Sequence, residues 1–294
     1  KEVIDADFDF QRGSAATRVN SQGLIENVQI LSGNLVQNGD FSEIGSEEVT
    51  NGDFATDSDW SKDSNWSISN GSASADGTSN NNISQSSVIP TVGKTYKITF
   101  EVLTISQGYF QARLGNELGV QANNVGVYTS YVKATTNDRI RIYGKSLAIG
   151  SIDNVSVKEV GQNWSFGGGW SMGNGVSESD STPSSYLGQE GVILTTNPYK
   201  LTFQARLKSG TNGTVTALIG GSNSNQFTIA DTNWQTFSYE NTRLPSAQTG
   251  IYFNNDGNEI EIDNVSVVEI TNDTDLPRID YTDGCGSLLL EPQS

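Results

Sequence analysis

An internal repeat constrains the fold of this chain more than any other feature of its sequence. Three anchors recur in the same order: a spaced tryptophan pair, a Tyr-Lys-Ile/Leu-Thr-Phe segment and an Ile-Asp-Asn-Val-Ser-Val segment. The two copies are offset by 104, 103 and 110 residues at the three anchors, so chance is a poor explanation and the chain contains one module twice. The anchors are Trp60 with Trp66, Tyr96–Phe100 and Ile152–Val157 in copy A, and Trp164 with Trp170, Tyr199–Phe203 and Ile262–Val267 in copy B.

The anchors alternate apolar and polar residues, as β-strands do. Tyr96–Phe100 places three apolar side chains on one face, and the same alternation in Ile152–Val157 places Asn154 on the face of Ile152. Clusters of Asn, Gly, Ser and Asp separate these short runs, and no stretch sustains helical periodicity. The predicted fold is all-β, with two antiparallel β-sandwich (jelly-roll) modules and a small terminal β frame.

One motif predicts how the modules are connected. Asn-Gly-Asp-Phe occurs at Asn38–Phe41 and Asn51–Phe54, both before copy A, whereas copy B begins abruptly at Trp164. We therefore hypothesise that copy A is inserted into the first loop of copy B; the alternative is a duplicated linker. The predicted boundaries are 46–160 for module A, 34–45 with 161–270 for module B, and 1–33 with 271–294 for the terminal frame or anchor.

Composition excludes several classes of function. The chain has 34 Asp and Glu against 17 Lys and Arg, a net charge of −17, which argues against nucleic-acid binding. It has no histidine, the commonest general base and metal ligand. No apolar run approaches the ~18 residues of a membrane span, and no carboxylate pair is marked by an apolar pocket that suits glycoside hydrolysis. We predict a non-enzymatic protein that neither inserts into membranes nor binds nucleic acid.

The motifs of residues 34–270 resemble family 4/9-type carbohydrate-binding modules, which are β-sandwich jelly rolls. Ile152–Val157 and Ile262–Val267 are the most specific part of this resemblance. The flanks, Phe8–Glu26 with Pro277–Tyr281 and Leu288–Gln293, resemble a frame found in fibre and adhesion proteins of tailed bacteriophages. The two resemblances together imply glycan-binding modules inserted into a phage structural frame.

The resemblance to these modules also implies a structural calcium ion where the opening strand meets the closing strand. Carried over, the ligands are Asp53 and Asp153 in module A, and Asp40 and Asp263 in module B. Oxygen ligands of this kind suit Ca²⁺. The alternative is that these residues bond their own backbone in turns.

Sugar binding is predicted from two alternating runs in module A. An aromatic ring packs on the apolar face of a sugar, while planar polar side chains bond its hydroxyl groups. If both runs lie in one sheet they form such a surface, although a solvated face of arginines bonded to acids fits them equally well. The comparable run of module B, with Thr214, Thr216 and Leu218, lacks rings and charge, which favours a mainly architectural role. The candidate residues are Tyr109, Gln111, Arg113, Arg139, Arg141 and Tyr143.

We therefore expect a structural or fibre protein of a phage virion whose modules contact host cell-surface glycan. Its expected partners are that glycan, other virion proteins and, in a homotrimer, further copies of itself; it is made in the host cytoplasm and displayed on the virion surface. The alternatives are a purely structural capsid or tail decoration and a bacterial secreted polysaccharide-binding adhesin. The absence of a signal-type segment and the phage-like flanks disfavour the adhesin.

Overall fold

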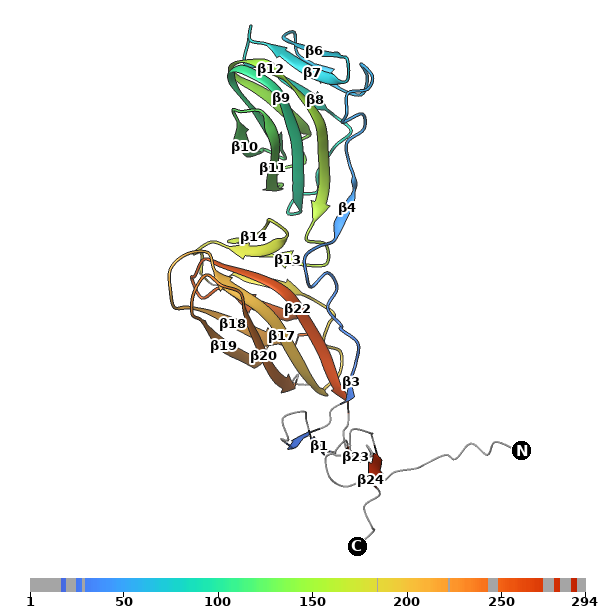
Figure 1. Cartoon of the computed structure of the whole chain (residues 1–294), viewed down its shortest axis with the longest axis vertical. Helices are drawn as coiled ribbons and strands as arrows, with labels where there is room; N and C mark the ends of the chain where they lie inside the picture. Colours follow the sequence, from blue (N-terminus) through green and yellow to red (C-terminus); the bar gives the residue numbers. More distant parts are fainter. Residues whose placement is uncertain are drawn as a thin grey trace, which may run out of the picture.

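The structure is a computed structural model in which two β-sandwiches follow one another along the long axis (Figure 1). The all-β fold predicted from the sequence is confirmed. Within the described residues, no helix is long and apolar enough to cross a membrane. The described residues are 31–183, 185–221, 223–242 and 248–271, with the short strands β1 (Thr17–Val19), β2 (Ile25–Asn27), β3 (Ile30–Leu31), β23 (Arg278–Asp280) and β24 (Ser287–Leu289).

The predicted terminal frame, 1–33 with 271–294, lies largely outside the described residues. Where it is described, β1 pairs with β2, β23 pairs with β24, and β1 lies beside β23. The two flanks of the chain therefore meet, and β3 leads from them to the last strand of module B, with which it pairs.

Two long strands, β9 and β12, run through both layers of module A. The N-terminal half of β9 pairs with β11 and its C-terminal half with β10, while β12 pairs first with β8 and then with β7. One layer has the order β6-β7-β12-β9-β11 and the other the order β5-β8-β12-β9-β10. The strands are β4 (Ile44–Glu47), β5 (Ser61–Lys62), β6 (Trp66–Ser69), β7 (Ser72–Asp76), β8 (Asn82–Gln85), β9 (Thr95–Leu114), β10 (Glu117–Ala122), β11 (Gly126–Lys133) and β12 (Ile140–Val160).

Module B repeats this topology with the long strands divided in two. Its layers are β14-β15-β22-β17-β20 and β13-β16-β21-β18-β19, so β17 with β18 corresponds to β9, and β21 with β22 to β12. The strands are β13 (Ser165–Phe166), β14 (Trp170–Gly173), β15 (Val176–Ser179), β16 (Tyr186–Gln189), β17 (Pro198–Leu207), β18 (Gly213–Ile219), β19 (Asn223–Ile229), β20 (Gln235–Thr242), β21 (Ile251–Asn254) and β22 (Ile260–Thr271).

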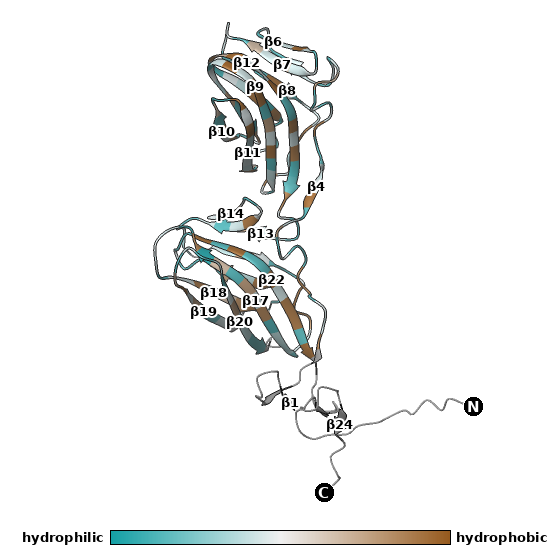
Figure 2. Cartoon of the chain, viewed as in Figure 1, coloured by the Kyte–Doolittle hydropathy of each residue, from teal (hydrophilic) through white to brown (hydrophobic). Residues whose placement is uncertain are grey.

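Each sandwich encloses a core of its own, and apolar and polar residues alternate along its strands (Figure 2). The four repeated tryptophans lie in these cores with 2–6% of their surface exposed, so their repetition reflects packing rather than ligand contact. These four residues are Trp60, Trp66, Trp164 and Trp170.

The Asn-Gly-Asp-Phe and Ile-Asp-Asn-Val motifs interlock in both modules. The Val155 amide donates to the carbonyl oxygen of Gly52, N to O 2.8 Å, and a Cβ at Gly52 would lie only 2.0 Å from the Val155 carbonyl oxygen. Gly39 and Val265 repeat both distances in module B. The motif therefore needs glycine because two backbones meet there.

The closing motif contains a β-bulge, which corrects the predicted alternation of Ile152–Val157. The register of β12 against β9 shifts between Asp153 and Ser156, and Asn154 adopts a left-handed conformation with φ 53°. Ile152 and Val155 therefore both point into the core, on the same side rather than on opposite sides. Asparagine tolerates this conformation better than most residues, which explains its presence at the bulge.

Residues 34–41 lie against module B rather than module A. Phe41 packs on Trp164 with ring centroids 5.0 Å apart, and the Trp164 indole N–H donates to the Asn38 carbonyl oxygen at 2.9 Å. Phe54, Trp60 and Asn51 make the corresponding contacts within module A. These contacts support the nested arrangement, in which β4 and the end of β12 pair where the chain passes between the modules.

Truncation of the two motif phenylalanines tests the nesting. We expect Phe41→Ala to destabilise module B by about 3–5 kcal/mol, because it leaves a cavity beside Trp164, and Phe54→Ala to do the same to module A. Hydrogen exchange measured by mass spectrometry should show faster exchange across 164–270 in the first variant and across 60–157 in the second. Faster exchange only in module A upon Phe41→Ala would contradict the nested arrangement.

Candidate functional site

Strands β9 and β12 place most of the predicted sugar-binding residues on one outer face of module A. The two strands are antiparallel neighbours, with Arg113 opposite Arg141 and Gln111 opposite Tyr143. The residues between them, such as Ala112 and Ile142, are fully buried, so the candidate side chains lie on the opposite face of the strands from the core. Tyr109, Arg113, Arg141 and Tyr143 are partly exposed there, whereas Gln111 is buried, with 7% of its surface exposed. We call this surface the module A face; it comprises Tyr109, Gln111, Arg113, Arg141, Tyr143 and Lys145.

The structure does not bring Arg139 into the same network. Arg139 precedes β12 and is exposed, and among the described residues no hydrogen bond joins its guanidinium group to the module A face. Lys145, which the sequence analysis missed, lies directly opposite Tyr109. It continues the alternation of residues 139, 141 and 143, so the signal was present in the sequence.

Hydrogen bonds hold the side chains of the module A face in place. Arg113 donates to the Tyr143 hydroxyl at 3.1 Å and also to the Asn116 side-chain oxygen. The Gln111 amide donates to the Gly119 carbonyl oxygen at 2.8 Å, and the Lys145 ammonium lies 4.3 Å from the centre of the Tyr143 ring. Arg113, Gln111, Tyr143 and Lys145 are thus held in place by neighbouring groups.

Arg141 has an acidic neighbour within its own turn. Its guanidinium group bonds the Asp138 carboxylate, and this hydrogen bond is the main reason that the pKa of Asp138 lies below its ordinary value. The charge of Arg113 acts in the same direction. Arg141 therefore fits the alternative interpretation, in which the arginines of this face bond neighbouring acids.

The equivalent face of module B has a different chemistry. Thr214, Thr216 and Leu218 point outward without rings or charge, as their sequence indicates, but the adjacent strands supply two tyrosines. The rings of Tyr186 and Tyr252 are 6.3 Å apart at 79°. We call this surface the module B face; it comprises Tyr186, Glu190, Thr216, Leu218, Gln226, Tyr252 and Asp256.

Glycine and acidic side chains shape the module B face. Tyr252 lies so close over Gly188 that a Cβ there would come within 2.6 Å of the ring, and its hydroxyl donates to the Glu190 carboxylate. Burial and this carboxylate raise the pKa of the Tyr252 hydroxyl above its ordinary value. Asp256 accepts hydrogen bonds from Thr216 at 2.8 Å and from Gln226. This aromatic pair was missed because its members come from strands distant in sequence.

The proposed calcium ligands approach one another as two pairs. Burial, then the charges of Glu101 and Asp53, raise the pKa of Asp153; burial and Asp40 raise that of Asp263. Asp40 also accepts hydrogen bonds from Ser42, which lower its own pKa, as the turn alternative predicts. Among the described residues, no group of three or more His, Cys, Asp or Glu side chains is placed to hold a metal ion. Calcium therefore stays a prediction.

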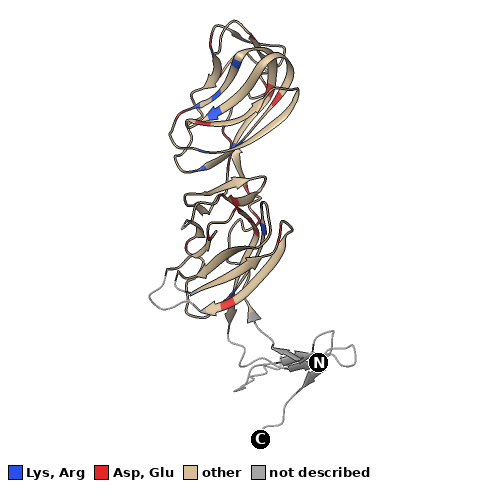
Figure 3. Cartoon of the chain, turned by 90° about the vertical axis from the view of Figure 1, so that its left-hand side faces the viewer, with Lys and Arg blue, Asp and Glu red and all other residues tan. Residues whose placement is uncertain are grey.

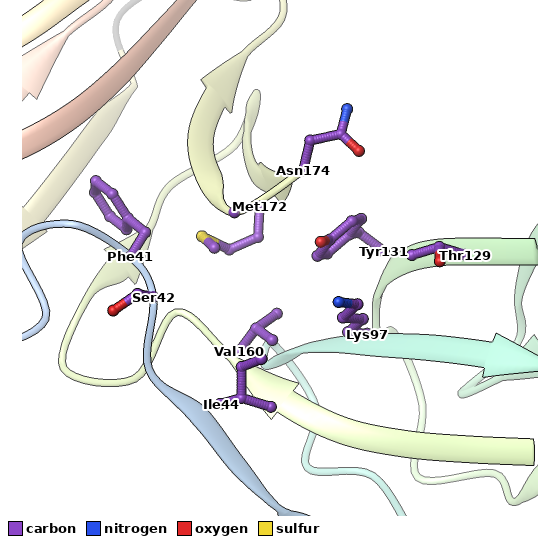
Figure 4. A pocket seen from close by; sticks show the side chains of 10 residues that line it. Phe41, Ser42, Ile44, Lys97, Thr129, Tyr131, Val160, Met172 and Asn174 are labelled. Atoms are coloured by element: carbon purple, nitrogen blue, oxygen red, sulfur yellow. The ribbon is translucent and has the colours of Figure 1, made fainter.

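A hollow of about 470 Å³ lies at the junction of the modules (Figure 4). Phe41, Val160 and Met172 supply apolar walls, and Lys97 is the charged residue among those that line it. Beside it, Lys133 donates to the Phe166 carbonyl oxygen of the other module at 2.7 Å. The residues around the hollow connect the two sandwiches.

No protein-family model matches the chain, and no curated protein matches it. Three solved structures show the kind of similarity found. The CBM22 tandem of Paenibacillus barcinonensis Xyn10C matches with a TM-score of 0.31 and 10% identity, over 78% of this chain and 98% of that one. A CBM4 structure matches with a TM-score of 0.29 and 16% identity, over 37% and 86%. The tandem CBM51 modules of the Streptococcus pneumoniae family 98 glycoside hydrolase Sp3GH98 match with a TM-score of 0.24 and 5% identity, over 88% and 89%. At these values the similarities establish no function for this chain.

The crowded carboxylates predict a pH-dependent stability. The folded pKa of Asp153 is raised, so the folded state binds its proton more tightly than the unfolded state does, and stability falls as pH rises through this pKa. In EDTA at pH 7 we expect Asp153→Asn to raise the melting temperature, with a gain that shrinks toward pH 4. Asp76→Asn is the matched control, because the pKa of Asp76 is lowered and its loss should reduce the melting temperature at pH 7. Equal effects of the two substitutions would contradict the prediction.

Calcium binding is tested on the same variant. If Ca²⁺ binds at Asp53 and Asp153, calcium at about 100 times its Kd stabilises the wild type by ~2.7 kcal/mol. Asp153→Asn should lose most of this gain, whereas Asp76→Asn should keep it. A melting temperature of the wild type that is the same in EDTA and in millimolar calcium would count against the site.

Proposed function

We propose that this chain is a non-enzymatic glycan-binding protein whose module A face contacts cell-surface glycan. The observation that supports this is a set of partly exposed side chains on two adjacent strands, two of them aromatic and three cationic. Tyr109 is partly exposed and supplies an aromatic ring, Arg113 and Arg141 supply planar hydrogen-bonding groups, and Tyr143 has the Lys145 ammonium over its ring. This combination suits the apolar face and the hydroxyl groups of a sugar.

The ordering of the face favours binding. Arg113, Gln111 and Tyr143 are held by neighbouring side chains or backbone, so little side-chain freedom is lost when a ligand binds. Asp138, the acid beside the face, is bonded to Arg141 and has a lowered pKa, which does not suit a general acid. These features support binding rather than hydrolysis.

The setting that we propose is the surface of a phage virion, where the protein is a structural or fibre component. This part rests on the resemblance of the flanks, which also suggests other virion proteins and further copies of this chain as partners and the host cytoplasm as the place of synthesis. A second candidate is a rigid structural spacer. The paired strands β4 and β12 and the bond from Lys133 to Phe166 favour it, because they fix one module against the other.

Binding to a glycan array separates the two candidates. We expect Tyr109→Ala to weaken binding of the wild-type ligand about ten-fold, or ~1.4 kcal/mol, because a partly exposed aromatic ring is removed from the face. Val127→Ala is the control: Val127 is 70% exposed on β11, in the other layer, and should have no effect. If neither the wild type nor the variants bind any glycan by array or calorimetry, the spacer function is the better one.

A further inference from the structure

The two modules differ in charge. Module A has nine Lys and Arg against twelve Asp and Glu, a net charge of −3, whereas module B has four against twelve, a net charge of −8. Figure 3 shows most of the basic residues in the upper sandwich, which is module A. Three of those nine, Arg113, Arg141 and Lys145, lie on the module A face. On a chain of net charge −17, such a concentration of cations needs an explanation.

The cations of the module A face are placed at a cost. Arg113 and Arg141 are directly opposite each other on neighbouring strands, where like charges destabilise a sheet. Asp138 neutralises Arg141, but among the described residues no carboxylate forms an ion pair with Arg113 or Lys145. Arg113 is oriented by uncharged partners instead, a tyrosine hydroxyl and an asparagine oxygen. Its charge helps to lower the pKa of Asp138, but among the described residues no carboxylate bonds its guanidinium group, which can therefore still bond an anion.

The same positions of module B carry no cation. Tyr252 lies opposite Leu218 on β21 and β18, as Arg141 lies opposite Arg113 on β12 and β9. The charged groups of the module B face are the carboxylates of Glu190 and Asp256. One scaffold thus presents a cationic face in one copy and an acidic, aromatic face in the other.

We infer that the module A face selects acidic glycan, in which carboxylate or sulfate groups occur on the sugar chain, and that the module B face does not. This inference rests on the proposed function. A guanidinium group bonds both oxygens of a carboxylate or a sulfate, which gives affinity and orientation. Arg113 donates to the Tyr143 hydroxyl, and the Lys145 ammonium lies 4.3 Å from the centre of the Tyr143 ring, so two cations gather around this ring. Lys145 also lies directly opposite Tyr109, so a sugar stacked on Tyr109 has a cation beside it.

The choice of anion follows from the rest of the face. Nucleic acid is the other polyanion to consider, but its phosphates need a long basic footprint. Tyr109, directly opposite Lys145, adds a partly exposed aromatic ring that suits a sugar ring. The negative charge of the chain also opposes binding of any polyanion away from this face.

The test compares matched acidic and neutral polysaccharides on the full chain. Calorimetry with galacturonan and its fully methyl-esterified form, and with sulfated galactan and unsulfated galactan, separates charge from sugar identity and carboxylate from sulfate. We expect an acidic member to bind at least ten-fold more tightly than its neutral partner. Its affinity should fall several-fold between 50 and 300 mM NaCl, because ion pairs between exposed groups are screened.

Substitutions assign the selectivity to the face. Arg113→Gln and Lys145→Gln should each reduce acidic-glycan affinity about five- to ten-fold and flatten its salt dependence. Lys200→Gln removes the same charge from module B, where Lys200 lies 4.0 Å from Glu240, and should leave binding unchanged. Tyr252→Ala should also leave it unchanged. Melting temperatures establish that each variant is folded.

Each other outcome overturns a different statement. If neutral and acidic partners bind equally and Tyr109→Ala weakens both, glycan binding stands and the selectivity for acidic glycan is wrong. If no polysaccharide binds, the proposed function fails as well. If a single-stranded oligonucleotide binds as tightly as the acidic glycan, the face is a general polyanion site. If Tyr252→Ala or Lys200→Gln removes binding of the acidic glycan, the site lies on module B.

Discussion

The close contact between a glycine and a valine carbonyl is the constraint on which both modules depend. Gly52 at Val155, and Gly39 at Val265, bring two backbones so close that any side chain would collide. The hydrogen bond from each valine amide closes the contact. Because the partner segment is a β-bulge, the opening turn and the closing strand specify each other, which explains why the two motifs recur together.

This interlock also determines how the chain is divided. Residues 34–41 can satisfy the bulge of only one module, and the structure places them at Val265 rather than at Val155. Module A has its own motif at Asn51–Phe54. The chain enters module A through β4 and leaves it through β12, and these two strands pair with each other. A module tethered at two adjacent points is restricted in its motion relative to its host. The module A face and the module B face are therefore connected through this one pair of strands.

The sequence predicted the fold well, and it predicted most of the residues that share the module A face. Alternation and repetition sufficed for the sandwiches, because burial of one strand face follows directly from residue type. Alternation could not predict which side chains of Ile152–Val157 point into the core, because the bulge at Asn154 inserts an extra residue. Five of six face residues were predicted because they share two strands. Tyr186 and Tyr252 were missed, because only tertiary pairing brings them together.

The module A face and the module B face differ because packing constrains the inward positions of the repeated strands but not the outward ones. Inward residues such as Ala112 and Ala217 are constrained by packing and are both fully buried. Outward positions of the same strands have no such constraint, so Arg113 and Leu218 can differ completely while the register stays the same. A duplicated sandwich thus maintains its stability through one face of each strand and can diversify its surface chemistry through the other. The cationic and aromatic faces of this chain are two outcomes of that freedom.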